Sequence, residues 1–589
     1  MRPANKFFAM LALMPAIAFA ASCASAPAFV KPGPLTLGPS GLRWVDKTMA
    51  RMTLEEKIGQ LIACRYAGNF FPADSEALAR MRNLVARYKV GGMIVFGGDA
   101  YETAHLNNAL QSAAAIPLLI ASDLERGTGT QITGSTLFPT IMGIGAADSE
   151  ELAESMGRIT ALEGRALGIH VTYAPVVDVN INPDNPIINT RAIGEDPAQV
   201  ARLAAAFIRG CQANGMIATA KHFPGHGDTD QDSHTLLPTI TAGRDRLERV
   251  ELFPYRKVIE SGVQAVMISH LSVPALDPTP NMPTTLSKAV VTDLLRGEMG
   301  FKGLIVTDAM EMGGVTTLYS DTEAALRAIL AGIDMVLLPL EPEKVIPFLI
   351  ETARSGKLPM ERIDQSVRRI LEAKARLGLP ENKLVDVDAL PAKLGTREYL
   401  REAQRAFERA TTLVKNTGNV LPLQSGERSI AVVSLSSDFG DYYAGRTFAD
   451  AVRKRAPKAR IFYADSETGK EALNEAYSAA ASADVVLCAV FSSLRAWKGS
   501  VGLNPLHVDV INNLTGLDKP VVVANFGSPY LFRNFPDVDA YLCFYRNTPQ
   551  AQEIAARAIF GEMDVNGKLP VSIPGLVPLG TGLTLSAKK

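Results

Sequence analysis

The chain of 589 residues lacks an excess of charge of either sign. Its 60 Lys and Arg residues and 61 Asp and Glu residues give a formal net charge of −1, and no basic run interrupts the sequence. An electrostatic grip on nucleic acid or on an anionic membrane surface is therefore not expected. The partners that this composition favours are small or neutral molecules.

Cysteine is scarce, and no nucleotide fingerprint is present. Four of the five cysteines lie scattered in apolar segments without the spacing of metal ligands, at positions Cys64, Cys211, Cys488 and Cys543. We expect these to be buried free thiols, because cysteine is often a small core residue. No glycine-rich dinucleotide or P-loop motif precedes the helical patterns of the C-terminal part, so no cofactor is predicted.

The chain also lacks a long apolar run at its amino terminus. Arg2 and Lys6 precede apolar residues 7–21, which are too few to span a bilayer comfortably but are typical of a secretory signal. The following residues, 20–23, fit either a cleavage site or a lipobox in which Cys23 would carry lipid. We therefore predict that residues 1–23 are a signal peptide and that the protein is exported, either periplasmic or lipid-anchored in the cell envelope.

The chain is long enough for at least two domains, and its 47% hydrophobic and 21% charged residues are ordinary for a globular protein. Strand-like apolar runs alternate with helical patterns between residues 50 and 340. There are eight such runs: 61–66, 91–96, 117–123, 171–178, 216–222, 265–270, 303–308 and 335–338. This alternation predicts a (β/α)8 TIM-type barrel over residues 40–378, with a doubly wound open sheet as the alternative.

A second domain is predicted beyond the barrel. Residues 379–415 are interpreted as a linker followed by a helix over 397–414. In residues 416–589, strand-like runs again alternate with helical patterns, which predicts an open α/β sheet. These runs are 429–435, 460–463, 484–491, 520–526 and 540–545.

Charged and imidazole side chains end five consecutive strand-like runs of the barrel. They are Asp123, Asp178, Lys221 with His222, His270 and Asp308. One such aspartate would most often be a helix cap or a turn former. Because parallel strands deliver their carboxyl ends to one shared face, five such ends together predict a ligand site there.

The densest group of titratable side chains is residues 221–234, which hold three of the seven histidines and three aspartates. His234 is the candidate proton shuttle, because histidine titrates near neutrality and Asp232 is near enough in sequence to orient its ring. Gly225 and Gly227 are expected to make the loop mobile. A loop-structuring hydrogen bond is the expected role of His226.

Asp308 is the candidate nucleophile of a two-step displacement. It follows the apolar residues 303–307, which would hold it rigidly, and it precedes small and turn-forming residues that leave access above it. A zinc site built from the three histidines of residues 221–234 is the alternative chemistry. Pro224 and Gly225 disfavour the helix that would present two of these histidines on one face, so no metal is predicted.

Three segments together resemble glycoside hydrolase family 3, specifically its β-N-acetylglucosaminidase branch in a two-domain form. They are residues 221–234 with Pro238, residues 303–312, and residues 189–197, and the likeness extends from about residue 40 to 575. Members are retaining enzymes with an aspartate nucleophile, which the resemblance places on Asp308. The branch uses a histidine assisted by an aspartate as acid/base, which places those roles on His234 and Asp232.

The resemblance also implies sugar-holding roles for Asp123, Arg191, Lys221 and His222. One departure concerns the segment after the third strand, where the branch usually has Gln-Glu-Gly-Gly-Arg after the aspartate. Residues 123–128 read Asp-Leu-Glu-Arg-Gly-Thr, so Thr128 stands in place of the expected arginine. Arg126 could reach the site from another direction, and the sugar selectivity is left open.

The second domain bears on the choice of branch. Two-domain β-glucosidases of the family take their acid/base glutamate from that domain, but residues 492–499, after the strand-like run 484–491, contain no carboxylate. The resemblance then leaves proton transfer to the Asp232–His234 loop.

The expected function is that of a retaining exo-β-N-acetylglucosaminidase. It would release terminal β-linked N-acetylglucosamine from small cell-wall or chitin-derived oligosaccharides. The alternatives are a β-glucosidase or β-xylosidase of the same family, a glycoside phosphorylase, and an inactive sugar-binding protein of the envelope. The oligomeric state is left open.

Overall fold

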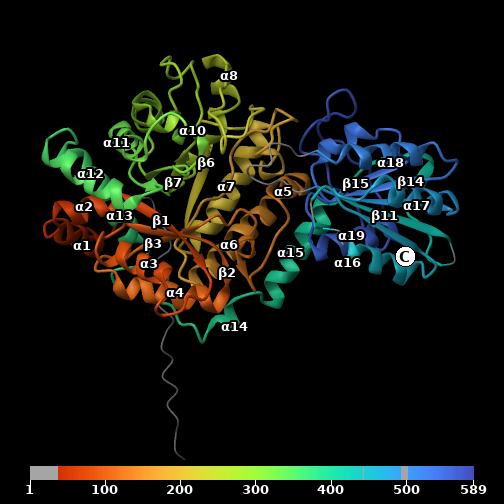
Figure 1. Ribbon diagram of the computed structural model, residues 1–589, viewed down its shortest axis with the longest axis horizontal. Helices are drawn as coiled ribbons and strands as arrows, with labels where there is room; N and C mark the ends of the chain where they lie inside the picture. The colour runs from red at the N-terminus through yellow and green to blue at the C-terminus, as the bar shows by residue number, and fades with distance from the viewer. Residues whose placement is uncertain (1–36, 427, 439, 442–443, 493–501, 589) are drawn as a thin grey trace, which may run out of the picture.

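The computed structural model describes residues 37–588 except 427, 439, 442–443 and 493–501. Two domains lie next to each other, and helix α15 (Arg397–Ala410) runs between them (Figure 1). Within the described ranges, no helix combines the length and the apolar character needed to cross a membrane. The predicted signal and Cys23 fall in residues 1–36 and lie outside the described part.

The first domain is a barrel of eight parallel strands, which confirms the predicted fold. Neighbouring strands follow the order β8-β7-β6-β5-β3-β2-β1-β9, and a bridge between Val306 and Met335 joins the two ends of this series. A doubly wound open sheet is excluded by this closure. The strands are β1 (Ile62–Gly68), β2 (Gly92–Asp99), β3 (Leu119–Ser122), β5 (Val171–Thr172), β6 (Ile217–Phe223), β7 (Ala265–Ile268), β8 (Leu304–Thr307) and β9 (Val336–Leu337).

Helices cover the outside of the barrel, and their ends follow from local sequence. The helix α6 (Glu150–Ala166) begins where the Ser149 hydroxyl accepts a hydrogen bond from the Leu152 amide. The helix α7 (Pro197–Ala213) begins at an Asp196 cap followed by proline, a favoured first residue. Both coincide with the helical patterns that the sequence shows over residues 150–167 and 197–214.

The helical pattern over residues 244–261 predicts one helix, which was wrong. The structure has α8 (Arg244–Arg249) and α9 (Leu252–Glu260), with a break between them. Pro254 explains the break. Its ring would clash with the carbonyl four residues earlier, and it has no amide hydrogen to continue the helical bonding.

A buried carboxylate, Asp334, lies at the seam where β8 and β9 close the barrel. Its amide donates to the carbonyl of Ile305 at 2.8 Å, and its Oδ2 accepts from the Ile305 amide at 3.0 Å. Arg369 and Arg362 contact Oδ1 at 2.8 and 3.2 Å, and Arg296 pairs with Oδ2. Burial raises the pKa of Asp334, but the three guanidinium groups outweigh it and lower that pKa.

The second domain is a six-stranded sheet in the order β10-β15-β14-β13-β11-β12, covered by helices on both faces. All pairs are parallel except β10 with β15. The five predicted strands are confirmed: β11 (Ile430–Ser436), β12 (Arg460–Ala464), β13 (Val485–Phe491), β14 (Val521–Asn525) and β15 (Ala540–Cys543). The helix predicted over 397–414 was wrong at its end, because the β-branched residues there form β10 (Thr412–Asn416).

The cysteines of the described part are buried in the two cores, as predicted. Cys64 and Cys211 lie in the barrel domain and Cys488 and Cys543 in the second sheet, and none forms a disulfide. Burial raises the pKa of the Cys64 thiol to about 12, so this group stays protonated and unreactive at neutral pH.

The carboxyl ends of β14 and β15 in the second sheet face the barrel. Tyr530, which follows β14, accepts a hydrogen bond from the side-chain amide of Asn180 at 2.9 Å. Farther along the interface, a carboxylate oxygen of Glu195 accepts from both the amide and the hydroxyl of Ser572, each at 2.9 Å. These contacts place the second domain beside the mouth of the barrel.

Replacing Asp334 with alanine is expected to destabilise the fold strongly, because three partly buried guanidinium groups would lose the buried carboxylate that they share. Removing one partner of a buried ion pair typically costs about 3–5 kcal/mol in the free energy of unfolding, which urea denaturation would measure. The control is Arg368→Ala, which removes an exposed 2.9 Å pair with Asp46. That change should cost about 0–1 kcal/mol, and equal stability of the two variants would contradict the role of Asp334.

Candidate active site

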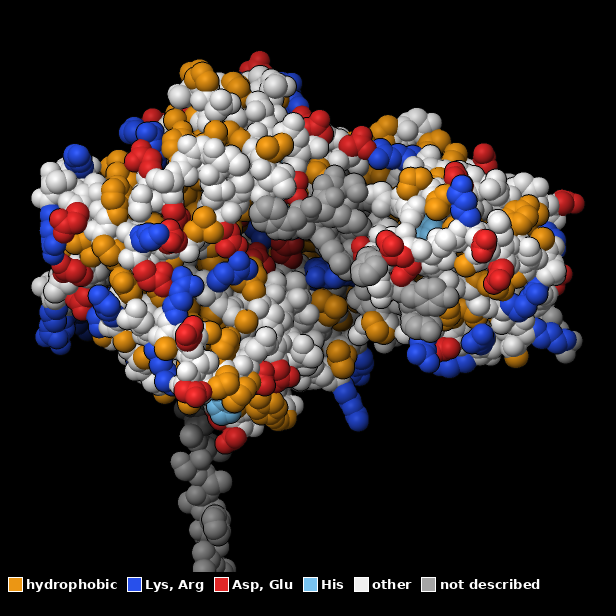
Figure 2. Space-filling view, in the orientation of Figure 1, with side chains coloured by type: hydrophobic (Ala, Val, Ile, Leu, Met, Phe, Trp, Pro, Cys, Tyr) orange, Lys and Arg blue, Asp and Glu red, His pale blue; other side chains and the backbone are white. Residues whose placement is uncertain are grey.

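A cavity of about 420 Å3 opens at the carboxyl ends of the barrel strands. Six of the seven predicted site residues line it: Asp123, Arg191, Lys221, His222, His234 and Asp308. Arg546, which follows β15, lines it from the second domain. Figure 2 shows the hollow between the two domains, with acidic and basic side chains gathered in it.

Four alternating charges form one wall of this cavity. Lys221 Nζ lies 2.6 Å from Asp123 Oδ1 and 2.7 Å from Glu125 Oε1. Arg191 donates from Nε and Nη2 to the two oxygens of Glu125 at 3.0 and 2.8 Å, a bidentate pair. The wall is therefore a fixed array of donors and acceptors suited to hydroxyl groups.

The pKa values of this wall follow from its pairing. Burial lowers the pKa of Lys221, but Asp123 and Glu125 outweigh burial and raise it. Burial raises the pKa of Glu125, but Arg191 and Lys221 outweigh burial and hold it well below its ordinary value. Both side chains are thus charged at neutral pH.

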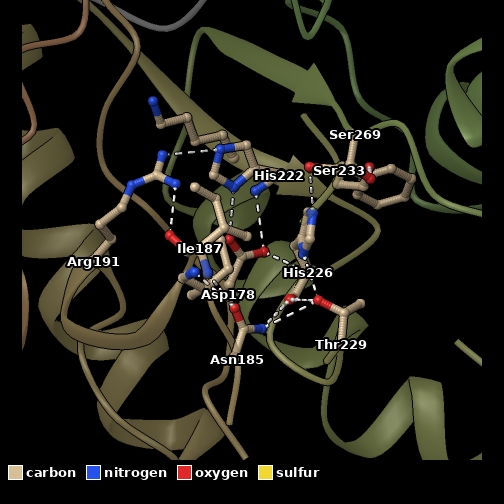
Figure 3. A network of polar contacts seen from close by, with 12 residues as sticks. Asp178, Asn185, Ile187, Arg191, His222, His226, Thr229, Ser233 and Ser269 are labelled. Atoms are coloured by element: carbon tan, nitrogen blue, oxygen red, sulfur yellow. Dashed lines mark hydrogen bonds and ion pairs between the residues drawn. The ribbon is translucent and has the colours of Figure 1, made fainter. Parts of the chain in front are cut away.

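The His222 ring is fixed by Asp178, a fully buried carboxylate. Asp178 Oδ2 lies 2.7 Å from His222 Nδ1, while its Oδ1 accepts from the amides of His222 and His226 at 3.1 and 2.7 Å (Figure 3). Because Nδ1 donates to the carboxylate, we assign the acceptor role to Nε2, which lies 3.4 Å from Arg191 Nη2. The ring orientation is thereby set on both sides.

His226 has the loop-structuring role expected from the sequence. Its Nδ1 lies 3.0 Å from the Thr229 hydroxyl and its Nε2 lies 2.9 Å from the Ser233 hydroxyl (Figure 3). Burial, together with the neighbouring His222, lowers the pKa of His226 to about 4. His226 is therefore neutral near pH 7 and connects the two ends of its loop.

Asp232 and His234 form the predicted pair. Asp232 Oδ1 accepts from the His234 amide at 2.9 Å and lies 2.7 Å from Nδ1 of the same ring. The side chain of Asp232 is 3% exposed and that of His234 is 23% exposed, so Asp232 lies behind the imidazole, which faces the cavity. Because Nδ1 is engaged by Asp232, proton exchange with a ligand falls to Nε2.

The loop that carries this pair is docked onto the turn after Asp308. The amides of Gly313 and Gly314 donate to the carbonyls of His234 and Ser233 at 2.9 and 3.1 Å. A Cβ on Gly313 would lie 2.4 Å from the Thr235 carbonyl oxygen, so this approach requires glycine. The two candidate catalytic groups are thus joined through the backbone.

The structure gives Gly227 a packing function. A Cβ at this position would lie 1.8 Å from the carbonyl oxygen of Val179, a distance that no side chain tolerates. Gly225 has a φ of +135°, a conformation that favours glycine. The mobility that these two glycines predict for the loop stays a prediction.

Asp308 follows β8 directly and presents an ionised carboxylate to the cavity. The Ala309 amide donates to its Oδ1 at 2.8 Å, and Ala309 is held in turn by His270, whose Nε2 lies 3.0 Å from the Ala309 carbonyl oxygen. Burial raises the pKa of Asp308, but the His222 and His270 rings and this amide outweigh burial and lower that pKa to about 2. A charged carboxylate at a fixed position is what a nucleophile requires.

The loop after β3 carries Thr128, which stands where the resemblance expects an arginine. The Thr128 side chain is buried, and its hydroxyl donates to the Thr160 carbonyl at 3.1 Å, away from the cavity. Arg126 lines the cavity instead. Sequence reasoning gave no role to Glu125, although an acidic residue two positions after a strand-end aspartate was a usable signal.

The zinc alternative finds no support in the geometry. Each of the three histidines in residues 221–234 has its own oxygen partner in the contacts described above. Among the described residues, no group of three or more His, Cys, Asp or Glu side chains is arranged to hold a metal ion. The second-domain loop that sequence analysis contrasted with β-glucosidases lies almost wholly in residues 493–501, outside the described part.

One cavity at the mouth of a TIM barrel thus holds an ionised strand-end carboxylate, the imidazole of an imidazole–carboxylate pair and a wall of paired charges, an arrangement typical of glycoside hydrolases. Two family models match the chain. Glycosyl hydrolase family 3 N terminal domain matches residues 53–373, and Glycosyl hydrolase family 3 C-terminal domain matches residues 411–579. The protein belongs to glycoside hydrolase family 3.

Similar proteins include enzymes with different named activities. A β-N-acetylglucosaminidase/β-glucosidase of Cellulomonas fimi is 29% identical over 564 residues, which cover 91% of this chain and 97% of that protein. The structure of a family 3 β-N-acetylglucosaminidase from Paenibacillus sp. str. FPU-7 has a TM-score of 0.79 and 32% identity, covering 89% and 99% of the two chains. A β-glucoside phosphorylase has a TM-score of 0.82 and 27% identity, covering 93% and 99%.

Replacing Gly313 with alanine is expected to lower glycosidase activity about tenfold or more, because a misplacement of about 1 Å in a catalytic group can cost on the order of 100-fold. The new Cβ would push the His234 loop away from Asp308. Hydrolysis of a chromogenic aryl glycoside would measure the effect. The matched control is Gly297→Ala, whose Cβ would meet only the Thr292 carbonyl oxygen at 3.5 Å. Equal activity of the two variants would contradict the proposed docking.

Proposed function

We propose that the protein is a retaining exo-β-N-acetylglucosaminidase that releases terminal β-linked N-acetylglucosamine. The observation that carries the proposal is the Asp232–His234 pair, whose imidazole lines the same cavity as the ionised Asp308. The names of the Cellulomonas and Paenibacillus relatives support the choice of sugar. The cavity volume lies in the range of small-molecule sites.

In the first step, a carboxylate oxygen of Asp308 attacks the anomeric carbon and the bond to the leaving oxygen breaks. His234 Nε2 delivers its proton to that oxygen, and Asp232 stabilises the ring and its tautomer. The products are a glycosyl ester on Asp308, a neutral His234 and the departing alcohol. Asp123, Lys221 and the residues beside them hold the ring hydroxyls with charge-assisted hydrogen bonds.

In the second step, His234 Nε2 takes a proton from water, and the water oxygen attacks the anomeric carbon. The ester bond breaks, and Asp308 leaves as a carboxylate. Two displacements at one carbon restore the β configuration, so the sugar is released with net retention.

The substrate source proposed here is cell-wall or chitin-derived oligosaccharide. This proposal depends on the predicted export signal in residues 1–23, and export and lipid on Cys23 remain predictions. A panel of aryl glycosides with and without the 2-acetamido group tests the sugar. Faster turnover of the glucoside or the xyloside would contradict the proposal and indicate a β-glucosidase or a β-xylosidase.

Phosphorolysis is the second candidate. The specific observation in its favour is that the acid/base candidate is an imidazole, which repels an incoming phosphate less than a carboxylate would. The likeness to a β-glucoside phosphorylase agrees with this reading. Adding inorganic phosphate distinguishes the two, because phosphorolysis yields a sugar 1-phosphate and hydrolysis yields the reducing sugar.

Replacing Asp308 with alanine is expected to lower kcat by several orders of magnitude, comparable to removing the nucleophile of a catalytic triad. Mass spectrometry of the wild type treated with a slow fluorinated N-acetylglucosaminyl substrate should find the sugar on the peptide that contains Asp308. Proton NMR of early product should show the β anomer. Initial release of the α anomer, or wild-type activity in the variant, would refute the mechanism.

The pH dependence should separate Asp308 from His234. The lowered pKa of about 2 means that Asp308 loses its nucleophilic charge only in strong acid, so it contributes no limb to the kcat/KM profile above about pH 4. The alkaline limb should follow the acid catalyst instead. In His234→Glu, this limb should move to lower pH, because carboxyl groups titrate below imidazoles. An unmoved limb would assign the proton transfer to another group.

A further inference from the structure

Arg126 is the one charged side chain of the loop after β3 for which the mechanism has no use. Its side chain lines the cavity and is largely buried. Its Nη1 atom is fully buried and, within the described part of the chain, has no hydrogen-bond partner. A buried guanidinium nitrogen without an acceptor is costly, because the group has lost its water and gained nothing in exchange.

The neighbouring carboxylate does not relieve this cost. Glu125 already accepts two hydrogen bonds from Arg191 and one contact from Lys221. Burial lowers the pKa of Arg126, the charge of Glu125 raises it, and the charge of Arg191 lowers it further, with burial the largest effect. A ligand cannot reach the buried Nη1 atom, but it can reach the part of the guanidinium group that lines the cavity, and an acceptor oxygen there would give this charge a partner.

The barrel topology fixes which part of a ligand Arg126 can meet. In the ring of eight strands, β3 lies four places from β8 in both directions, so the loop after β3 lies across the mouth from Asp308. A sugar with its anomeric carbon at Asp308 points its remote atoms, C4 and C6, toward this loop. Lys221 and Asp123, which lie on the same side, are placed for hydroxyls of that end.

We propose that Arg126 is a specificity-determining residue that donates a hydrogen bond to the hydroxyl oxygen on C4 or C6 of the terminal sugar. The inference rests on the proposed function of this cavity. It explains why the loop places a guanidinium at position 126 while Thr128 turns its hydroxyl away to Thr160. A group attached to the bound oxygen would collide with the loop, so the contact also restricts cleavage to unsubstituted sugar ends.

The test combines changes in the enzyme with changes in the substrate. The substrates are 4-nitrophenyl β-N-acetylglucosaminide and its 4-deoxy and 6-deoxy analogues, and the enzymes are wild type, Arg126→Met and Arg126→Lys. In the wild type, loss of the bound hydroxyl should lower kcat/KM by about 10- to 100-fold, the effect of a hydrogen bond to a charged group. In R126M, the same loss should cost less than about threefold, and R126K should fall between.

Stability separates this role from a structural one. Removing a buried charge that lacks a partner should leave the thermal midpoint of R126M unchanged or higher. A lower midpoint together with equal loss on all three substrates would overturn the proposal. So would a deoxy penalty in R126M as large as in the wild type.

A control variant and a second sugar series complete the design. Arg209→Met removes an exposed arginine that pairs with Glu150 and Glu154 on the outer face of the barrel, and it should keep the wild-type discrimination. If the wild type prefers glucosides, the proposed function fails, and the deoxy series is then built on the glucoside. The role of Arg126 is thereby tested separately from the identity of the sugar.

Discussion

Closure of the barrel at Asp334 is the constraint on which the rest of the structure depends. This carboxylate joins the backbone of β8 to the start of β9 and is held by three arginines. Only a closed ring sets the loop after β3 opposite the end of β8. The nucleophile candidate and the wall of paired charges face each other for that reason, and a single small molecule can contact both.

The site is assembled from buried charges that are paired before any ligand arrives. Lys221 and Arg191 share Glu125, His222 is fixed by Asp178, and His234 is fixed by Asp232. Such pairing removes the cost of reorganising polar groups during the reaction, which is a main source of electrostatic catalysis. Arg126 departs from this rule, because its guanidinium group lines the same cavity and has a buried nitrogen without a partner among the described residues.

Sequence reasoning succeeded where a local pattern carries the information. Apolar runs of strand length identified all eight barrel strands, and their ends identified Asp308 and Asp123, because parallel strands deliver their ends to one face. Sequence reasoning failed where a nearby proline or β-branched residue overrides the helical spacing of apolar residues. The apolar spacing predicts one continuous helix where Pro254 causes a break between two. The β-branched residues after Ala410 form an edge strand, β10, where a continuing helix was predicted.

By itself, the sequence determined the two-domain α/β architecture, the strand-end groups and the Asp232–His234 pair, all of which depend on residues close together in the chain. Only the tertiary structure decided that Glu125 pairs with Arg191, 66 residues away, and that Arg546 of the second domain borders the same cavity. It also decided that Thr128 turns away while Arg126 turns in. Periodicity specifies which face of an element is buried, but the partner of a buried charge depends on how distant elements pack, and no local pattern encodes that choice.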